Sequence, residues 1–127
     1  MEDRQHPSLD IKGTRGLELS GKGIVLGITG SVASVTSPEL ARLLIRHGAD
    51  VYTVMTESAS RLINPELMYW ATGTEPVTRL SGFIEHVALC GNVPDKADCL
   101  LIAPATANTI GKIACGIDDT PVTTFAT

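Results

Sequence analysis

Three short apolar segments, separated by helix-like segments, constrain the fold of this chain most strongly. Gly23–Ile28 has the length of a strand and is rich in β-branched residues. Ala49–Met55 and Asp98–Ala103 have the same character. Apolar runs of this length are typical of parallel strands that are buried on both faces. Because helical segments lie between them, the sequence predicts an α/β fold with a parallel sheet and helices on both faces.

Periodicity and capping residues predict the helices. Ser37–His47 carries leucines on one face and arginines on the other, and Gly48 follows it as a C-terminal cap. A start at Ser37 is one interpretation, but we favour a helix that begins near Ser31 and bends at Pro38.

Shorter helical segments complete the pattern. Glu57–Leu62 and Pro65–Ala71 read as short helices, and we expect Tyr69 and Trp70 to pack in the core or at a subunit contact. The loop that follows has room for a short strand at Val77. A further element, with helix as one interpretation, is expected to begin in 120–127.

Length and composition limit the number of domains and the classes of binding partner. The 127 residues suit one domain or part of one, with an N-terminal extension or arm at 1–22 and a domain at 23–127. The extension is either disordered or lies on a neighbouring subunit. The net charge is −4 and no basic patch with aromatic residues is visible, which argues against nucleic acid as a partner.

Membrane insertion, export and metal binding are not expected. No apolar run reaches the roughly 20 residues of a membrane span, and Met1–Gly13 lacks the apolar region of a signal peptide. Cys90, Cys99 and Cys115 form no C-x-x-C pair, so neither a zinc site nor a disulfide framework is indicated. We therefore expect reduced thiols in a cytoplasmic protein without a metal.

Small and polar residues follow the third strand. In Leu100–Ala114 the apolar run ends at Pro104, and a helix with Ile110 and Ile113 facing inward is expected from Asn108. Ligands of open α/β sheets bind at the carboxyl ends of strands, where small side chains let a planar ligand approach. A well-capped strand-to-helix turn without a ligand is the other interpretation.

The other two strands also end in residues suited to an anion. After the first strand, Gly30 lets the backbone come close and Ser31 offers a hydroxyl. The spacing is neither the dinucleotide fingerprint nor a Walker A loop, so a mononucleotide phosphate fits best, with a plain strand-to-helix turn as the alternative. Thr56 and Ser58 would lie on the same sheet edge, and Glu57 is either a ribose-binding acid or a solvated helix residue.

These segments together resemble a known family. GKGIVLGITGSVAS, SPELARLLIRHGADVYTVMTESA, EHVAL and ADCLLIAPATANTIGKIACGIDDTPVTTF are similar, in this order, to the flavin-dependent cysteine decarboxylases. The resemblance covers about residues 21–127, and the PATANTIGKIA segment is its most specific part. It implies a flavodoxin-like sheet that binds FMN, and it implies a homotrimer or a multiple of trimers.

The resemblance also implies the site residues. The positions of the family's FMN-binding loops are Gly30, Ser31, Val32, Thr56, Ser58, Thr106, Ala107, Asn108 and Thr109. The family's catalytic histidine falls on His86 and its carboxylate-binding asparagine on Asn108. Without the resemblance, His86 is open to a second interpretation as a buried structural histidine. An asparagine binds a carboxylate without adding charge, which favours its release as carbon dioxide.

The implied reaction is the decarboxylation of phosphopantothenoylcysteine to phosphopantetheine in coenzyme A synthesis. FMN would oxidise the thiol-bearing carbon, carbon dioxide would leave, and the reduced flavin would return hydride. Other family activities remain alternatives: a peptidyl-cysteine decarboxylase, a flavin prenyltransferase, a flavin reductase or a non-catalytic FMN-binding regulatory subunit. An α/β domain without a ligand is a further alternative.

Two departures from the family pattern modify these expectations. Ser34-Val35-Thr36 stands where the family often has an aromatic residue and a lysine. The family's substrate flap, with its cysteine, would lie beyond Thr127, and Cys115 belongs to a different motif. We therefore expect an incomplete decarboxylase domain that binds FMN poorly and does not complete turnover alone.

Overall fold

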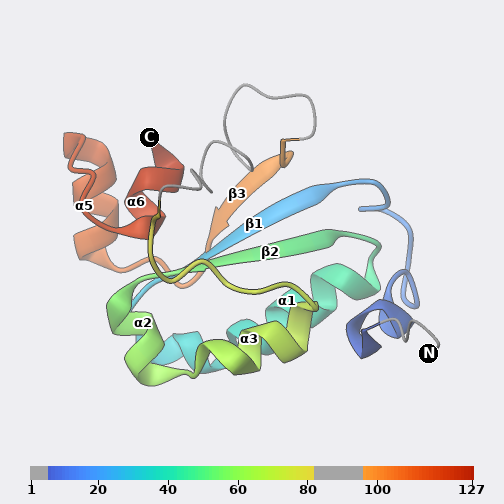
Figure 1. Cartoon of the computed structure of the whole chain (residues 1–127). Helices are drawn as coiled ribbons and strands as arrows, with labels where there is room; N and C mark the ends of the chain where they lie inside the picture. The colour runs from blue at the N-terminus through green and yellow to red at the C-terminus, as the bar shows by residue number, and fades with distance from the viewer. Residues whose placement is uncertain (1–5, 82–95) are drawn as a thin grey trace.

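The computed structural model describes residues 6–81 and 96–127 (Figure 1). At its centre, the described residues form a three-stranded parallel sheet in the order β2-β1-β3. The strands are β1 (Gly23–Ile28), β2 (Asp50–Met55) and β3 (Cys99–Ile102). β1 is the central strand and pairs with both neighbours in parallel register. All three carboxyl ends therefore lie at one edge of the sheet.

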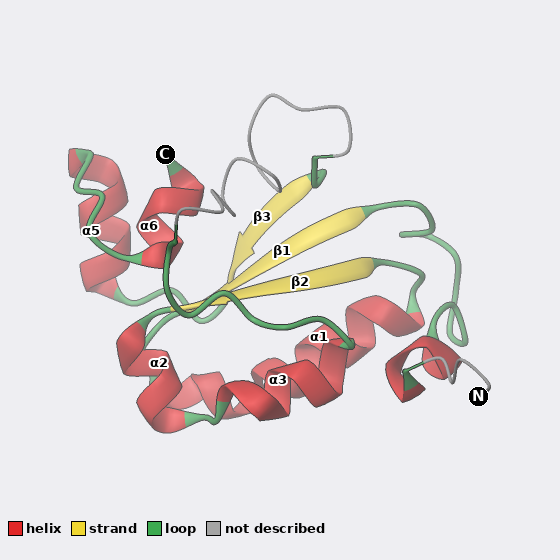
Figure 2. Ribbon diagram, in the orientation of Figure 1, coloured by secondary structure: helices red, strands yellow, loops and turns green. Residues whose placement is uncertain are grey.

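Helices surround the sheet (Figure 2). The α-helices are α1 (Ser37–Arg46), α2 (Glu57–Leu62), α3 (Pro65–Thr72), α5 (Ala107–Cys115) and α6 (Pro121–Ala126). Two 3₁₀-helices, η1 (Pro7–Ile11) and η2 (Val32–Thr36), precede β1 and α1 respectively. None of the helices in the described part of the chain is long and apolar enough to cross a membrane.

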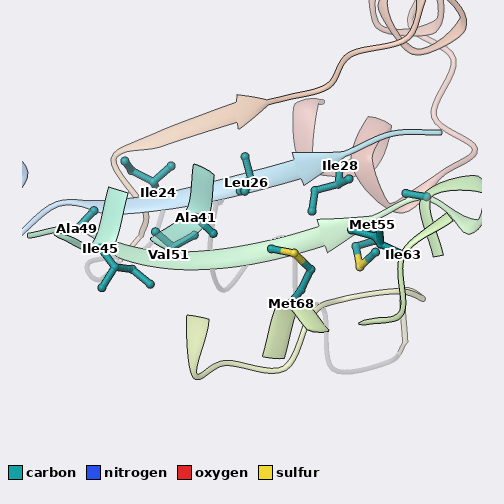
Figure 3. Packing of buried hydrophobic residues seen from close by; sticks show 11 residues of the cluster. Ile24, Leu26, Ile28, Ala41, Ile45, Ala49, Val51, Met55, Ile63 and Met68 are labelled. Atoms are coloured by element: carbon teal, nitrogen blue, oxygen red, sulfur yellow. The ribbon is translucent and has the colours of Figure 1, made fainter. Parts of the chain in front are cut away.

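The main core lies between the sheet and helices α1–α3 (Figure 3). Alternate residues of β1, namely Ile24, Leu26 and Ile28, face this side, where Met68 of α3 is fully buried. Each side chain of this size contributes about 1.5–3 kcal/mol when it is completely buried. This layer holds the sheet edge in place because α1 and α2 both begin there.

A second, smaller core covers the opposite face. Val25 and Val54 pack there against Val122 and Phe125 of α6. Gly27 permits the close approach of this helix, since a Cβ at that position would lie 3.3 Å from Val122 Cγ1. Helices therefore lie on both faces of a parallel sheet, which confirms the predicted α/β class.

Most predicted elements are present with small changes at their ends. The first strand is Gly23–Ile28 as expected, and both short helices are found. The chain turns helical directly after Ser31, as we favoured, but its first turns are the 3₁₀-helix η2 and α1 begins at Ser37. Val77 forms a single parallel bridge with Val54, the short strand that the sequence allowed.

Of the two places expected for Tyr69 and Trp70, the core of this chain is excluded, and a subunit contact stays a prediction. Tyr69 and Trp70 are 43% and 51% exposed in this chain, so they do not belong to its core. The buried residues of α3 are Met68, Ala71 and Thr72, and these smaller side chains form the face toward the sheet. The guanidinium of Arg42 lies 4.4 Å from the centre of the Trp70 ring.

Ile110 does not face inward, and the prediction for it is wrong. It is 56% exposed, whereas its neighbour Thr109 is 5% exposed and is the buried residue of α5. The hydroxyl of Thr106 accepts a hydrogen bond from Thr109 N and donates one to Thr109 Oγ1. This capping arrangement turns Thr109, and not Ile110, toward the body of the protein.

Residues 6–22 lie against the carboxyl end of α1 of the same chain. The backbone N–H groups of Gly13, Arg15 and Leu19 donate to the last carbonyls of that helix and its cap, at 3.0, 2.9 and 2.9 Å. Glu18 also pairs with His47 at 2.9 Å. This hydrogen bond lowers the pKa of the Glu18 carboxyl. The described part of the predicted extension thus satisfies helix carbonyls that lack partners within the helix.

Candidate functional site

A hollow of about 340 Å³ lies where the carboxyl ends of the strands meet. The loops after β1, β2 and β3 all contribute to it. Its lining residues are Gly30, Thr56, Glu57, Ser58, Thr106, Asn108, Thr109, Lys112 and Thr120. Six of the nine predicted cofactor-binding residues are in this set: Gly30, Thr56, Ser58, Thr106, Asn108 and Thr109.

The remaining predicted residues are placed differently. Ser31, Val32 and Ala107 are adjacent in sequence to the lining residues but do not line the hollow themselves. Val32 is 77% exposed. His86 lies outside the described residues, so its catalytic role stays a prediction.

The loop after β1 packs tightly against the start of α2. A Cβ atom at Gly30 would lie only 2.4 Å from Ser58 Cβ, which is far closer than two carbon atoms can approach. Glycine is therefore required here by the neighbouring loop.

Helix starts surround the hollow. Thr56, Thr106 and Thr120, which all line it, are the N-caps of α2, α5 and α6, and Ser31 caps η2 beside it. Each cap side chain accepts one first-turn N–H, at 3.1–3.2 Å. Other first-turn N–H groups have no acceptor within their helix. The hollow is therefore rich in hydrogen-bond donors.

Thr29 connects two of the loops and was not singled out from the sequence. Its hydroxyl donates to the carbonyl oxygen of Pro104 at 2.6 Å and accepts from Thr106 N at 3.0 Å. The side chain is 1% exposed. A threonine directly after a buried strand is the only sequence signal for this role, and many such threonines merely end a strand.

Asn108 and Thr109 occupy the first turn of α5. Asn108 is exposed at the hollow, and its side-chain amide makes no hydrogen bond with the described residues. A primary amide can both donate and accept, so it can receive a carboxylate or a carbonyl group. Thr109 is buried and its hydroxyl is engaged by Thr106.

Lys112 is a second residue that sequence reasoning missed. Its ammonium group donates to both carboxylate oxygens of Asp119, at 2.9 and 3.0 Å. The lysine side chain is 22% exposed. The pair ties α5 to the loop before α6 and so fixes one wall of the hollow.

Glu57 lies at the rim in the first turn of α2. Its carboxylate pairs with Arg61 at 2.8 Å, and the glutamate side chain is 85% exposed. This geometry favours the solvated helix residue over the ribose-binding acid. A carboxylate in the first turn of a helix is also stabilised by the helix dipole.

A larger hollow of about 780 Å³ shares Glu57 and Thr120 with the first one. Its other lining residues are Ser60, Thr78, Arg79, Leu80, Asp118, Asp119, Pro121 and Thr124. The two hollows therefore meet along one rim. An elongated ligand can extend from the donor-rich hollow into the larger one.

Comparisons with known proteins agree on the family to which the chain is similar. Residues 13–127 match the model of the Flavoprotein family. The coenzyme A biosynthesis bifunctional protein CoaBC of Thermococcus kodakarensis is 58% identical over 117 residues, which are 92% of this chain and 29% of that protein. CoaBC of Methanocaldococcus jannaschii is 43% identical over 121 residues, 95% of this chain and 29% of that protein. The chain thus spans less than a third of the length of these relatives.

Solved structures resemble the fold as well. The FMN-dependent cysteine decarboxylase SpaF superposes with a TM-score of 0.73 at 33% identity, over 85% of this chain and 63% of that one. A mutant PPC decarboxylase complexed with pantothenoylaminoethenethiol gives a TM-score of 0.64 at 26% identity, over 83% and 59% of the two chains. The parallel sheet, the donor-rich sheet edge and these matches lead to one conclusion: the chain belongs to the flavoprotein family.

Proposed function

We propose that this chain is the FMN-binding part of a decarboxylase that converts phosphopantothenoylcysteine to phosphopantetheine in coenzyme A biosynthesis. The observation that carries the proposal is the hollow formed by three strand-end loops, in a chain 58% identical to a coenzyme A biosynthesis protein. The structure with pantothenoylaminoethenethiol bound to a PPC decarboxylase supports the same substrate class.

The residues of the smaller hollow fit the phosphate of FMN. Gly30 and Ser58 pack closely together in the wall of the hollow, and the first turns of α5 and α2 contribute to the same lining. Amide and hydroxyl donors near helix N-termini stabilise a phosphate dianion. When bound, FMN supplies a reversible acceptor for the electrons of the thiol-bearing carbon.

Asn108 would hold the reacting carboxylate. Its amide N–H group can donate to a carboxylate oxygen without adding a full positive charge. Weak binding of the ground-state carboxylate favours its loss as carbon dioxide, because only interactions stronger in the transition state accelerate a step. His86 would move the proton, as the family resemblance implies.

The proposal also includes an oligomeric state and a cellular compartment. The exposed apolar side chains Ile110 and Ile117 of the α5 region suit a contact with another subunit, and we propose the homotrimer or multiple of trimers that the resemblance implies. The exposed Cys99 and Cys115 are free thiols, which suits the reducing cytoplasm that we propose.

The decisive experiment measures turnover by the complete FMN-loaded protein. Phosphopantothenoylcysteine is compared with a peptide that ends in cysteine, and carbon dioxide release is recorded. We expect turnover of the first substrate, and at least about a hundredfold lower kcat/KM in Asn108→Ala, since loss of a group that positions the reacting part of the substrate can have that effect. Bound FMN absorbance checks that the variant is loaded. No turnover of phosphopantothenoylcysteine would refute the proposal.

Decarboxylation of a peptide carboxy-terminal cysteine is the second candidate. It is favoured by the TM-score of 0.73 with the cysteine decarboxylase SpaF, above the 0.64 obtained with the PPC decarboxylase. The same assay separates the two, because preferential turnover of the peptide would support this candidate.

A further inference from the structure

Most of the charged residues that line the two hollows have ion-pair or hydrogen-bond partners within the chain. Five charged side chains contribute to the linings: Glu57, Arg79, Lys112, Asp118 and Asp119. Glu57 is paired with Arg61, and Lys112 with Asp119. Asp118 accepts hydrogen bonds from the hydroxyls of Thr124 and Thr127. Among the described residues, one charged group of this set has neither an ion pair nor a hydrogen bond.

That charge belongs to Arg79. Its guanidinium makes no ion pair and no hydrogen bond with the described residues, and its side chain lines the larger hollow. Two residues earlier, the backbone of Val77 is held by β2: Met55 N donates to Val77 O, and Val77 N donates to Thr53 O, both at 2.9 Å. The chain thus carries an uncompensated cation into the hollow from a backbone anchored on the sheet.

The surroundings of Arg79 suit an anion with several oxygens. Thr78 brings a hydroxyl group to the same hollow, whereas the hydroxyl of Ser60, which also lines it, donates to Thr56 O at 3.2 Å. A guanidinium group binds phosphate through two parallel N–H···O bonds, which an ammonium group cannot do. The negative charge of Asp119 is offset by Lys112, so this carboxylate repels an anion less, whereas Asp118 has only hydroxyl partners and keeps its charge.

We propose that Arg79 binds the phosphate of the phosphorylated substrate and sets the preference for it over the unphosphorylated compound. The inference rests on the proposed function. Asn108, at the reacting carboxylate, lines the smaller hollow, while Arg79 lines only the larger one. Phosphopantothenoylcysteine is elongated, with its phosphate at the end remote from the cysteine. A substrate whose cysteine lies at Asn108 therefore extends its phosphate into the larger hollow.

The test compares phosphopantothenoylcysteine with pantothenoylcysteine in the complete FMN-loaded protein. In Arg79→Met we expect the KM for the phosphorylated substrate to rise about tenfold to hundredfold, as for a lost charged hydrogen bond, with kcat retained. The KM for the unphosphorylated substrate stays the same. Arg79→Lys keeps the charge but loses the bidentate geometry. Its KM for the phosphorylated substrate should therefore lie between those of the unaltered protein and Arg79→Met.

Arg15→Met is the matched control. Arg15 is another exposed arginine without an ion pair among the described residues, and it lines a separate hollow on α1. We expect its kinetics to match those of the unaltered protein. Equal effects of Arg79→Met on both substrates, or no effect on either, would overturn the inference.

A binding measurement keeps the two proposals separate. If the complete protein turns over neither substrate, the proposed function fails, and calorimetric binding of phosphopantetheine and pantetheine then decides the role of Arg79. A preference for the phosphorylated compound that Arg79→Met abolishes supports the role. The absence of such a preference overturns it.

Discussion

The hydroxyl of Thr29 and the backbone N–H of Thr106 are 3.0 Å apart and form a hydrogen bond across 77 positions of sequence. The same hydroxyl donates to Pro104 O at 2.6 Å. One buried side chain after β1 therefore holds both ends of the turn that leads into α5. The position of Asn108, two residues further on, depends on this connection.

Replacement of Thr29 by valine should loosen that turn. Valine has nearly the same shape but lacks the hydroxyl, so Thr106 N loses its acceptor in a half-buried environment. We expect a loss of about 1–3 kcal/mol in the free energy of unfolding, measured by urea denaturation. Thr29→Ser keeps the hydroxyl and serves as the control. Equal stability of the valine and serine variants would show that the connection contributes little.

Gly30→Ala should destabilise the protein through a clash with the neighbouring loop. The new Cβ would lie 2.4 Å from Ser58 Cβ, so one of the two loops must move. Overpacking of this kind commonly costs about 1–3 kcal/mol. The double variant Gly30→Ala, Ser58→Gly removes the clashing atom and should recover most of the loss in thermal or urea unfolding. Failure of the second change to restore stability would contradict the packing argument.

Adjacent residues of α3 should differ sharply in their contribution to stability. Met68 is completely buried in the main core (Figure 3). Leu67 is 41% exposed. Met68→Ala leaves a cavity and should lower the free energy of unfolding by about 2–5 kcal/mol. Leu67→Ala removes a similar side chain from the surface and should change it by about 0.5 kcal/mol or less. Similar losses for both variants would mean that α3 packs by another face.

The pair of Glu18 and His47 should make stability fall in acid. The hydrogen bond from His47 lowers the pKa of Glu18 in the folded chain. A lowered folded-state pKa stabilises the protein fully above the ordinary pKa of glutamate and loses this effect as the pH falls through the lowered value. Glu18→Gln should therefore flatten the acidic limb of a plot of unfolding free energy against pH. An unchanged acidic limb would contradict this role.

Much of the fold could be predicted because its strands are buried on both faces. The unbroken apolar run Gly23–Ile28 has few other interpretations, and its position at the centre of the sheet explains its composition. The helices were harder to orient. Ile110 was expected to face inward, yet Thr109 occupies that place, and Ala71 rather than Trp70 lies in the core of this chain. Size and hydrophobicity do not reveal which helix face meets the sheet when small residues form the contact.

The candidate site was predictable where it follows strand ends. Gly30, Ser58 and Asn108 are close to one another because parallel strands bring their carboxyl ends to one edge. Lys112 and Arg79 could not be found in this way. Lys112 enters the hollow from the second turn of α5, and Arg79 from a segment that the backbone hydrogen bonds and side-chain packing of Val77 place beside β2.

The most direct test of the account is an FMN titration of the purified complete protein, followed by visible absorbance and gel filtration. Ser31→Asp keeps a good helix cap but adds negative charge beside the proposed phosphate position. Thr14→Asp adds the same charge at an exposed site in the segment before β1. We predict that FMN stays bound to the unaltered protein and to Thr14→Asp, and binds Ser31→Asp at least about tenfold more weakly. Absence of bound FMN in the unaltered protein, or equal affinity in all three, would contradict a mononucleotide site at this edge of the sheet.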